Sequence, residues 1–140
     1  MSPLSLTRRV TFAAAHRYRR PEWSEERNTE VFGNCARLPW HGHTYTCDVS
    51  VSGPVDEVTG FVIDLRALDQ ALDREVMQRF DHRNINTDVP EFAEGKLVPS
   101  CENLAAFIAE HVQTALGNRA RVSRVWVSES PTLWAEWVAD

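Results

Sequence analysis

The chain has 140 residues, of which 43% are hydrophobic and 25% charged, a balance typical of one soluble domain, and we expect a single domain over residues 1–140. The net charge of -5 argues against general binding to nucleic acid or anionic membranes, and no apolar run is long enough to span a membrane. Three cysteines without CxxC spacing indicate neither a disulfide framework nor a cysteine zinc finger. Since no cleavable leader opens the sequence, we expect a cytoplasmic protein.

The first predicted strand covers about residues 6–16 and ends on a histidine. Every second side chain lines one face of a strand, and this face carries Val10, Phe12, Ala14 and His16. Residues 17–40 are polar and predict a long loop, which in compact domains is commonly functional or disordered. Most of the charges of this loop are expected to be solvated, although some of its arginines could meet an anionic substrate.

The second predicted strand opens with His41-Gly42-His43 and continues into an apolar row. Both imidazoles point the same way, roughly 6.5 Å apart along the strand, and both could reach one ion. His16 could supply a third ligand. Three histidines without a fourth protein ligand are typical of catalytic zinc sites, which keep an open position. The alternative is three core histidines satisfied by backbone groups, but three unpaired burials would be costly.

Two amphipathic helices are predicted next. Asp64 is a plausible N-cap, followed by apolar residues at helical spacing, namely Leu65, Leu68, Leu72, Val76 and Phe80. The second helix runs from its N-cap Ser100 to Leu116 and stops at Gly117. His111 falls at the margin of its apolar stripe, which indicates a packing or surface role.

The last two predicted strands cover about residues 121–128 and 132–138. Glu129 shares a face with Val125 and Val127, and a carboxylate at the end of an apolar row needs either a partner or solvent. The order strand, strand, helix, helix, strand, strand predicts an α+β fold. We expect a four-stranded antiparallel sheet with the helix pair on one face.

Two further groups could carry chemistry beside a metal. Cys35 lies six residues before His41, and a thiol near a cation ionises more readily. In the pair Asp81-His82 the carboxylate could orient the imidazole. The alternatives are an inert cysteine and a dipeptide that merely occupies a turn.

Taken together, the motifs resemble the 6-pyruvoyl-tetrahydropterin and 6-carboxy-tetrahydropterin synthases of the tunnelling fold. The resemblance runs almost end to end, and its motifs are residues 12–17 (FAAAHR), 32–35 (FGNC), 41–43 (HGH), 59–65 (TGFVIDL), 80–86 (FDHRNIN), 88–90 (DVP), 100–103 (SCEN) and 127–130 (VSES). One such motif could arise by chance, but the ordered set is specific.

The resemblance implies a lyase that eliminates triphosphate from 7,8-dihydroneopterin triphosphate and needs no redox cofactor. It implies Zn2+ on His16, His41 and His43, Cys35 as the proton-abstracting thiolate, and Asp81 with His82 as a second relay. Glu129 would anchor the pterin through a forked pair of hydrogen bonds, and is also counted with the relay in such proteins. Ser100 and Cys101 occupy positions where the family often has two threonines that help to hold the ring, so the contribution of Cys101 is open.

The resemblance also implies homo-oligomers, usually hexamers, because one four-stranded sheet cannot close a barrel; the sites then lie at subunit junctions. Five residues between Cys35 and His41 favour the pyruvoyl branch, which serves tetrahydrobiopterin biosynthesis. The alternatives are the carboxy branch, on the queuosine and deazapurine route, and a homologue that binds metal or pterin without turnover.

Overall fold

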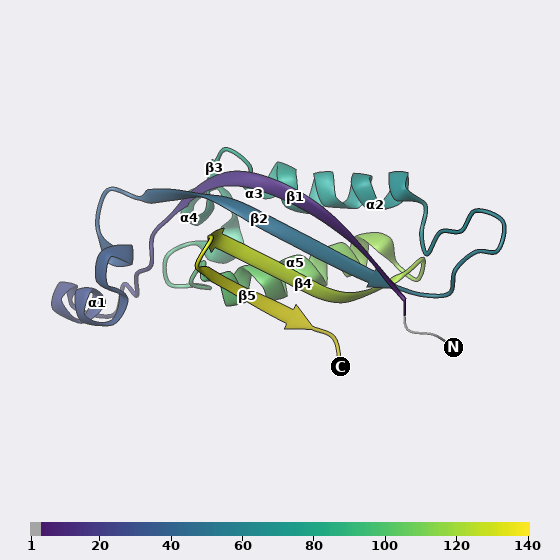
Figure 1. Ribbon diagram of the computed structural model, residues 1–140. Helices are drawn as coiled ribbons and strands as arrows, with labels where there is room; N and C mark the ends of the chain where they lie inside the picture. Colours follow the sequence, from purple (N-terminus) through teal and green to yellow (C-terminus); the bar gives the residue numbers. More distant parts are fainter. Residues whose placement is uncertain (1–3) are drawn as a thin grey trace.

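The computed structural model describes residues 4–140, which form a five-stranded sheet in the order β3-β1-β2-β4-β5 (Figure 1). The strands are β1 (Ser5–His16), β2 (His41–Ser52), β3 (Arg83–Asn84), β4 (Arg121–Ser130) and β5 (Leu133–Val138). All neighbouring pairs are antiparallel except β1 and β3, which are parallel. The expected α+β fold is confirmed, but the expected four strands are corrected to five. A two-residue strand such as β3 is too short to be predicted from an alternation of polar and apolar residues.

The two predicted helices cover one face of the sheet, behind the strands in Figure 1. The first comprises α2 (Leu65–Leu72), a π-helical turn η2 (Asp73–Met77) and α3 (Gln78–Phe80), and the second is α5 (Cys101–Leu116). The Asp64 side chain accepts from the Arg66 N–H, and Ser100 Oγ accepts from the Asn103 N–H, so both expected N-caps are present. Leu68 and Leu104 are fully buried beneath the sheet, and each such burial stabilises the fold by about 1.5–3 kcal/mol.

The long stretch between β1 and β2 is not the simple loop that the sequence predicts. It contains α1 (Glu25–Phe32) and a 3-10 turn, η1 (Gly33–Ala36), which together lie beyond the ends of β1 and β2 (Figure 1). Ser24 Oγ caps α1 by accepting from the Arg27 N–H. Asn28 is the buried residue of this helix, so the apolar periodicity that usually reveals a helix is missing.

Two short helices follow β3, namely α4 (Ile85–Asp88) and the 3-10 turn η3 (Pro90–Phe92), and neither is among the predicted elements. Ile85 and Phe92 are fully buried and close the core at the end of the sheet where β1 ends. Within residues 4–140, no helix combines the length and apolar character needed to cross a membrane.

Candidate metal centre and active site

The register between β1 and β2 brings three histidines together at one end of the sheet. His16 pairs across the ladder with His41, and Ala14 pairs with His43. The ligand atoms of the three imidazoles all lie within 4.8 Å of one another, and the Nε2 atoms of His16 and His41 are 3.1 Å apart. A tetrahedral ion with Zn–N bonds of 2.0–2.1 Å needs nitrogens about 3.3 Å apart. The cluster therefore has the donor atoms and approximate spacing to hold a metal ion.

The buried environment of His16 keeps this ring in the neutral form that binds metals. The side chain is 0% exposed, and burial, followed by the neighbouring His41 and His43, lowers its pKa to about 3. Its Nδ1 is 2.7 Å from the hydroxyl of Tyr45, which is also buried. A hydrogen bond at the second ring nitrogen fixes the orientation of the imidazole and leaves Nε2 free for an ion.

Glu129 reaches the same cluster from β4. The pairing of β4 with β5 shifts register between Ser128 and Ser130, and such a bulge can re-aim a side chain. Glu129 Oε2 lies 4.0 Å from the Nε2 of His16 and 3.8 Å from the Nε2 of His43. Glu129 Oε2 and His43 Nε2 are buried without a hydrogen-bond partner among the described residues. Unsatisfied buried polar atoms are rare, so this pair is suited to contact a bound ion or ligand.

Cys35, on η1, lies at the His41 side of the cluster. Both residues line a pocket of about 460 Å³ beyond the ends of β1 and β2. The backbone carbonyl of Cys35 accepts a 2.7 Å hydrogen bond from the Tyr18 N–H, which ties η1 to the segment after β1. Burial, and then the charge of Glu129, raise the pKa of the Cys35 thiol. The chain alone therefore does not favour the thiolate, and a nearby cation would have to supply that bias.

Ser100 and Cys101 lie where the chain enters α5. The Ser100 hydroxyl accepts from the Asn103 N–H as the helix cap. Cys101 is 3% exposed, its sulfur faces the backbone N–H of Glu129, and burial raises its pKa to about 12. The Cys101 thiol is thus a neutral group packed against the carboxylate-bearing segment.

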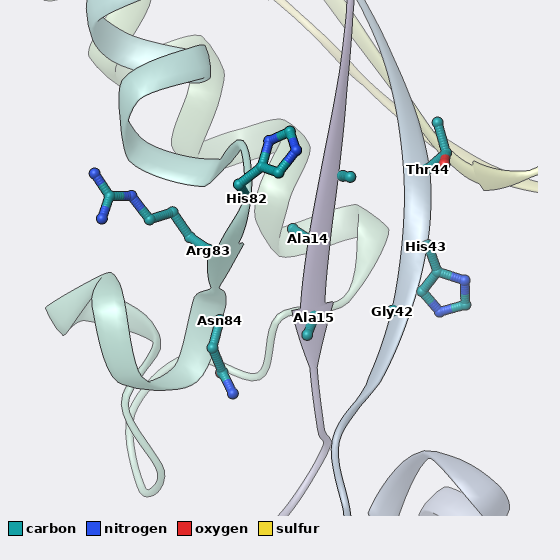
Figure 2. A pocket seen from close by; sticks show the side chains of 9 residues that line it. Ala14, Ala15, Gly42, His43, Thr44, His82, Arg83 and Asn84 are labelled. Carbon is teal, nitrogen blue, oxygen red and sulfur yellow. The ribbon is translucent and has the colours of Figure 1, made fainter.

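The Asp81-His82 pair is intact but stands apart from the cluster. Asp81 Oδ2 is 3.0 Å from His82 Nδ1, and Asp81 Oδ1 accepts from the Ala13 N–H. The His82 side chain is 84% exposed, and its backbone has a φ of 59°. Figure 2 shows His82 on the β3 side of β1 and His43 on the outer side of β2, with both strands between them. Within one chain, the pair does not join the three histidines.

The register of the sheet explains this separation. Ala14 pairs with Arg83 on one side and with His43 on the other, so β3 and β2 are two strand spacings, or about 10 Å, apart. β2 and β3 both flank an open pocket of about 530 Å³, whose floor consists of small residues, among them Ala13, Ala15 and Gly42 (Figure 2).

Tyr45 and Tyr18 contact the cluster and are not among the site residues predicted from the sequence. Tyr45 continues the row of His41 and His43, so alternation could have identified it as their neighbour. The ring of Tyr18 lies 4.8 Å from that of His16, and burial and then Glu129 raise its pKa. His111, by contrast, stacks on Phe107 at 3.9 Å and has the expected packing role.

Known proteins that are similar to this chain share one family description. The family model for 6-pyruvoyl tetrahydropterin synthase matches residues 5–140. A 6-pyruvoyl tetrahydrobiopterin synthase of Drosophila melanogaster is 40% identical over 127 residues, which cover 90% of this chain and 74% of the relative. A 6-carboxy-5,6,7,8-tetrahydropterin synthase of Bacillus subtilis is 32% identical over 108 residues, covering 74% of this chain and 69% of the relative.

A solved structure is similar over the full length of the chain. The 6-pyruvoyl tetrahydropterin synthase of Caenorhabditis elegans superposes with a TM-score of 0.91 and 30% identity, and the match covers 100% of this chain and 98% of that one. The family model and the Drosophila relative establish the relationship independently of this superposition. The chain therefore belongs to the 6-pyruvoyl tetrahydropterin synthase family.

Proposed function

We propose that this chain is a zinc-dependent 6-pyruvoyl-tetrahydropterin synthase, a lyase that eliminates triphosphate from 7,8-dihydroneopterin triphosphate. The observation that carries the proposal is the cluster of His16, His41 and His43 with Glu129 facing it, in a member of this family. The reaction moves oxidation state within one molecule through proton transfers, so it needs residues that hold, take and return protons. Cys35, Glu129 and His82 are such residues.

The donor set fits zinc. Three imidazoles without a fourth protein ligand leave a position open for a substrate oxygen. His43 Nε2 and Glu129 Oε2, which are buried and lack hydrogen-bond partners in the chain, border this position. When bound, the ion would act as a Lewis acid on the side-chain oxygens of the substrate and favour the thiolate form of Cys35.

In this proposal the protein residues divide the work between binding and proton transfer. Glu129 accepts hydrogen bonds from the amino group and ring N–H of the pterin, for which a carboxylate 10% exposed at the base of the site is well placed. Cys101 packs against the Glu129 backbone, and Ser100 holds the start of α5, so both support the same anchor. Cys35, at the mouth of the pocket beside His41, takes the proton of the substrate side chain.

We further propose that Asp81 and His82 serve a site completed by a second chain. The observation in favour is that Asp81 contacts His82 and accepts a hydrogen bond from the Ala13 N–H, while the imidazole is 84% exposed and distant from the cluster of its own chain. A homo-oligomer, with a hexamer as the expected form, would place such an exposed relay opposite the Cys35 of a neighbour. The outer edge of β5 is also available for pairing with another strand.

The product decides between the two branches of the family. Anaerobic incubation of zinc-loaded protein with dihydroneopterin triphosphate, followed by mass spectrometry, should give the pyruvoyl-tetrahydropterin mass and release of triphosphate. The Cys35→Ala variant is the matched control and should lose turnover. Carboxy-tetrahydropterin with acetaldehyde would assign the protein to the carboxy branch. Pterin and metal binding without any turnover above the Cys35→Ala background would show a non-catalytic homologue.

A further inference from the structure

The pocket beyond His41 lies next to the cluster histidine that Glu129 does not closely approach. Among the described residues, Glu129 comes within 4.0 Å of ring nitrogens of His16 and His43 but not of His41. His41 instead lines the pocket of about 460 Å³ with a set of residues from η1 and the segment that follows it, namely Asn34, Cys35, Arg37, Leu38, Pro39 and Trp40. A molecule anchored at Glu129 that extends past the cluster toward His41 would enter this pocket.

The arginines near this end of the sheet differ in whether a carboxylate neutralises them. Three of them have acidic partners at 3.6 Å or less, and the pairs are Arg17 with Glu94, Arg19 with Glu25, and Arg20 with Glu22. Arg37 forms no ion pair with the described residues and has one contact, from its Nη1 to the Asn34 Oδ1 at 3.4 Å. Arg37 is therefore an exposed guanidinium with most of its donors free, in the wall of a pocket that also contains Cys35 and His41.

We propose that Arg37 binds the triphosphate group of the substrate and so selects the phosphorylated pterin over its dephosphorylated form. This inference rests on the proposed function, in which the pterin ring binds to Glu129 and the oxygens of the substrate side chain face the histidines. The triphosphate at the far end of the substrate side chain then reaches the pocket wall. A guanidinium presents a planar fork of donors that matches phosphate oxygens.

The test compares two unreactive ligands, oxidised neopterin triphosphate and oxidised neopterin, whose fluorescence reports binding to the zinc-loaded protein. The wild type should bind the triphosphate form more tightly. In Arg37→Gln this preference should fall about tenfold, the lower end for a lost hydrogen bond to a charged group, while the affinity for neopterin stays unchanged. Because the side chain is exposed, the variant is expected to fold, and bound zinc and the melting temperature verify this.

Arg27→Gln is the matched control. It removes one positive charge from α1, where Arg27 stacks on Trp23 at 4.8 Å and does not line the pocket. An unchanged preference in Arg37→Gln would overturn the assignment. An equal loss in both variants would also overturn it, because it would show that the triphosphate responds to the overall electrostatic field of the protein and not to a contact with Arg37. Either result in a protein that still turns over dihydroneopterin triphosphate leaves the proposed function intact. A wild type that neither binds pterin nor turns over would end both proposals.

Discussion

The hydroxyl of Tyr45 should control how tightly the histidine cluster holds its metal. It is 2.7 Å from His16 Nδ1, both side chains are 0% exposed, and no solvent can replace the contact. Tyr45→Phe removes this oxygen but keeps the ring, which stacks on Phe12 at 4.9 Å, so no sizeable cavity forms. Loss of a partner that orients a ligand typically lowers metal affinity 10- to 100-fold, or about 1.4–2.7 kcal/mol.

Competition with a chromophoric chelator measures this change directly. Tyr18→Phe is the control, because its ring lies 4.8 Å from that of His16 but its hydroxyl forms no hydrogen bond to a cluster histidine among the described contacts. The metal-free Tyr45→Phe protein should lose about 1–3 kcal/mol of unfolding free energy, as expected when a buried ring nitrogen loses its hydrogen-bond partner. Zinc affinity equal to wild type, or an equal loss in both variants, would refute the role given to the Tyr45 hydroxyl.

Three further variants test the remaining parts of the site. His41→Ala should lose bound zinc, measured by elemental analysis, together with activity; full zinc content would remove His41 from the ligand set. Glu129→Gln should weaken neopterin binding about tenfold or more in a fluorescence titration, with zinc retained, and unchanged binding would contradict the anchor. The Ala13 N–H and then His82 lower the pKa of Asp81, so its ionised form contributes stability above the unfolded pKa of about 3.9. At pH 7 the urea midpoint of the wild type should therefore exceed that of Asp81→Asn. The difference between the two midpoints should shrink as the pH falls below about 4 toward the lower folded pKa of Asp81. A difference that stays constant with pH would contradict this coupling.

The sequence predicts best where side-chain alternation and burial coincide. The row from His41 to Val51 has its apolar members buried as expected, and Tyr45 and Val49 are both 0% exposed. The helices that begin after Asp64 and Ser100 start at those caps, because a side-chain oxygen there satisfies a free backbone N–H. These features depend on neighbours close in sequence, which is why they can be read from it.

The features that escaped prediction depend on contacts between distant segments or on weak local patterns. α1 buries Asn28 where an apolar stripe would normally be, so its local signals are limited to its ends, namely the N-cap Ser24, the acidic first turn and Gly33 after the last turn. β3 exists because Arg83 and Asn84 pair with β1, nearly 70 residues away. The position of His82, outside the cluster of its own chain, follows from that pairing and could not be deduced from the motif alone.

The convergence of the histidines is ultimately a property of strand register. His16 and His41 face each other because β1 and β2 pair over their full lengths, from Ser5 opposite Ser52 to His16 opposite His41. A slip of one residue would turn His41 and His43 to the opposite face of the sheet, and would also expose the apolar row that continues through Tyr45. The free energy of burying this row in the core that it shares with residues of α2 and α5 therefore fixes the register. The same packing that stabilises the fold holds three imidazoles close enough to bind one ion.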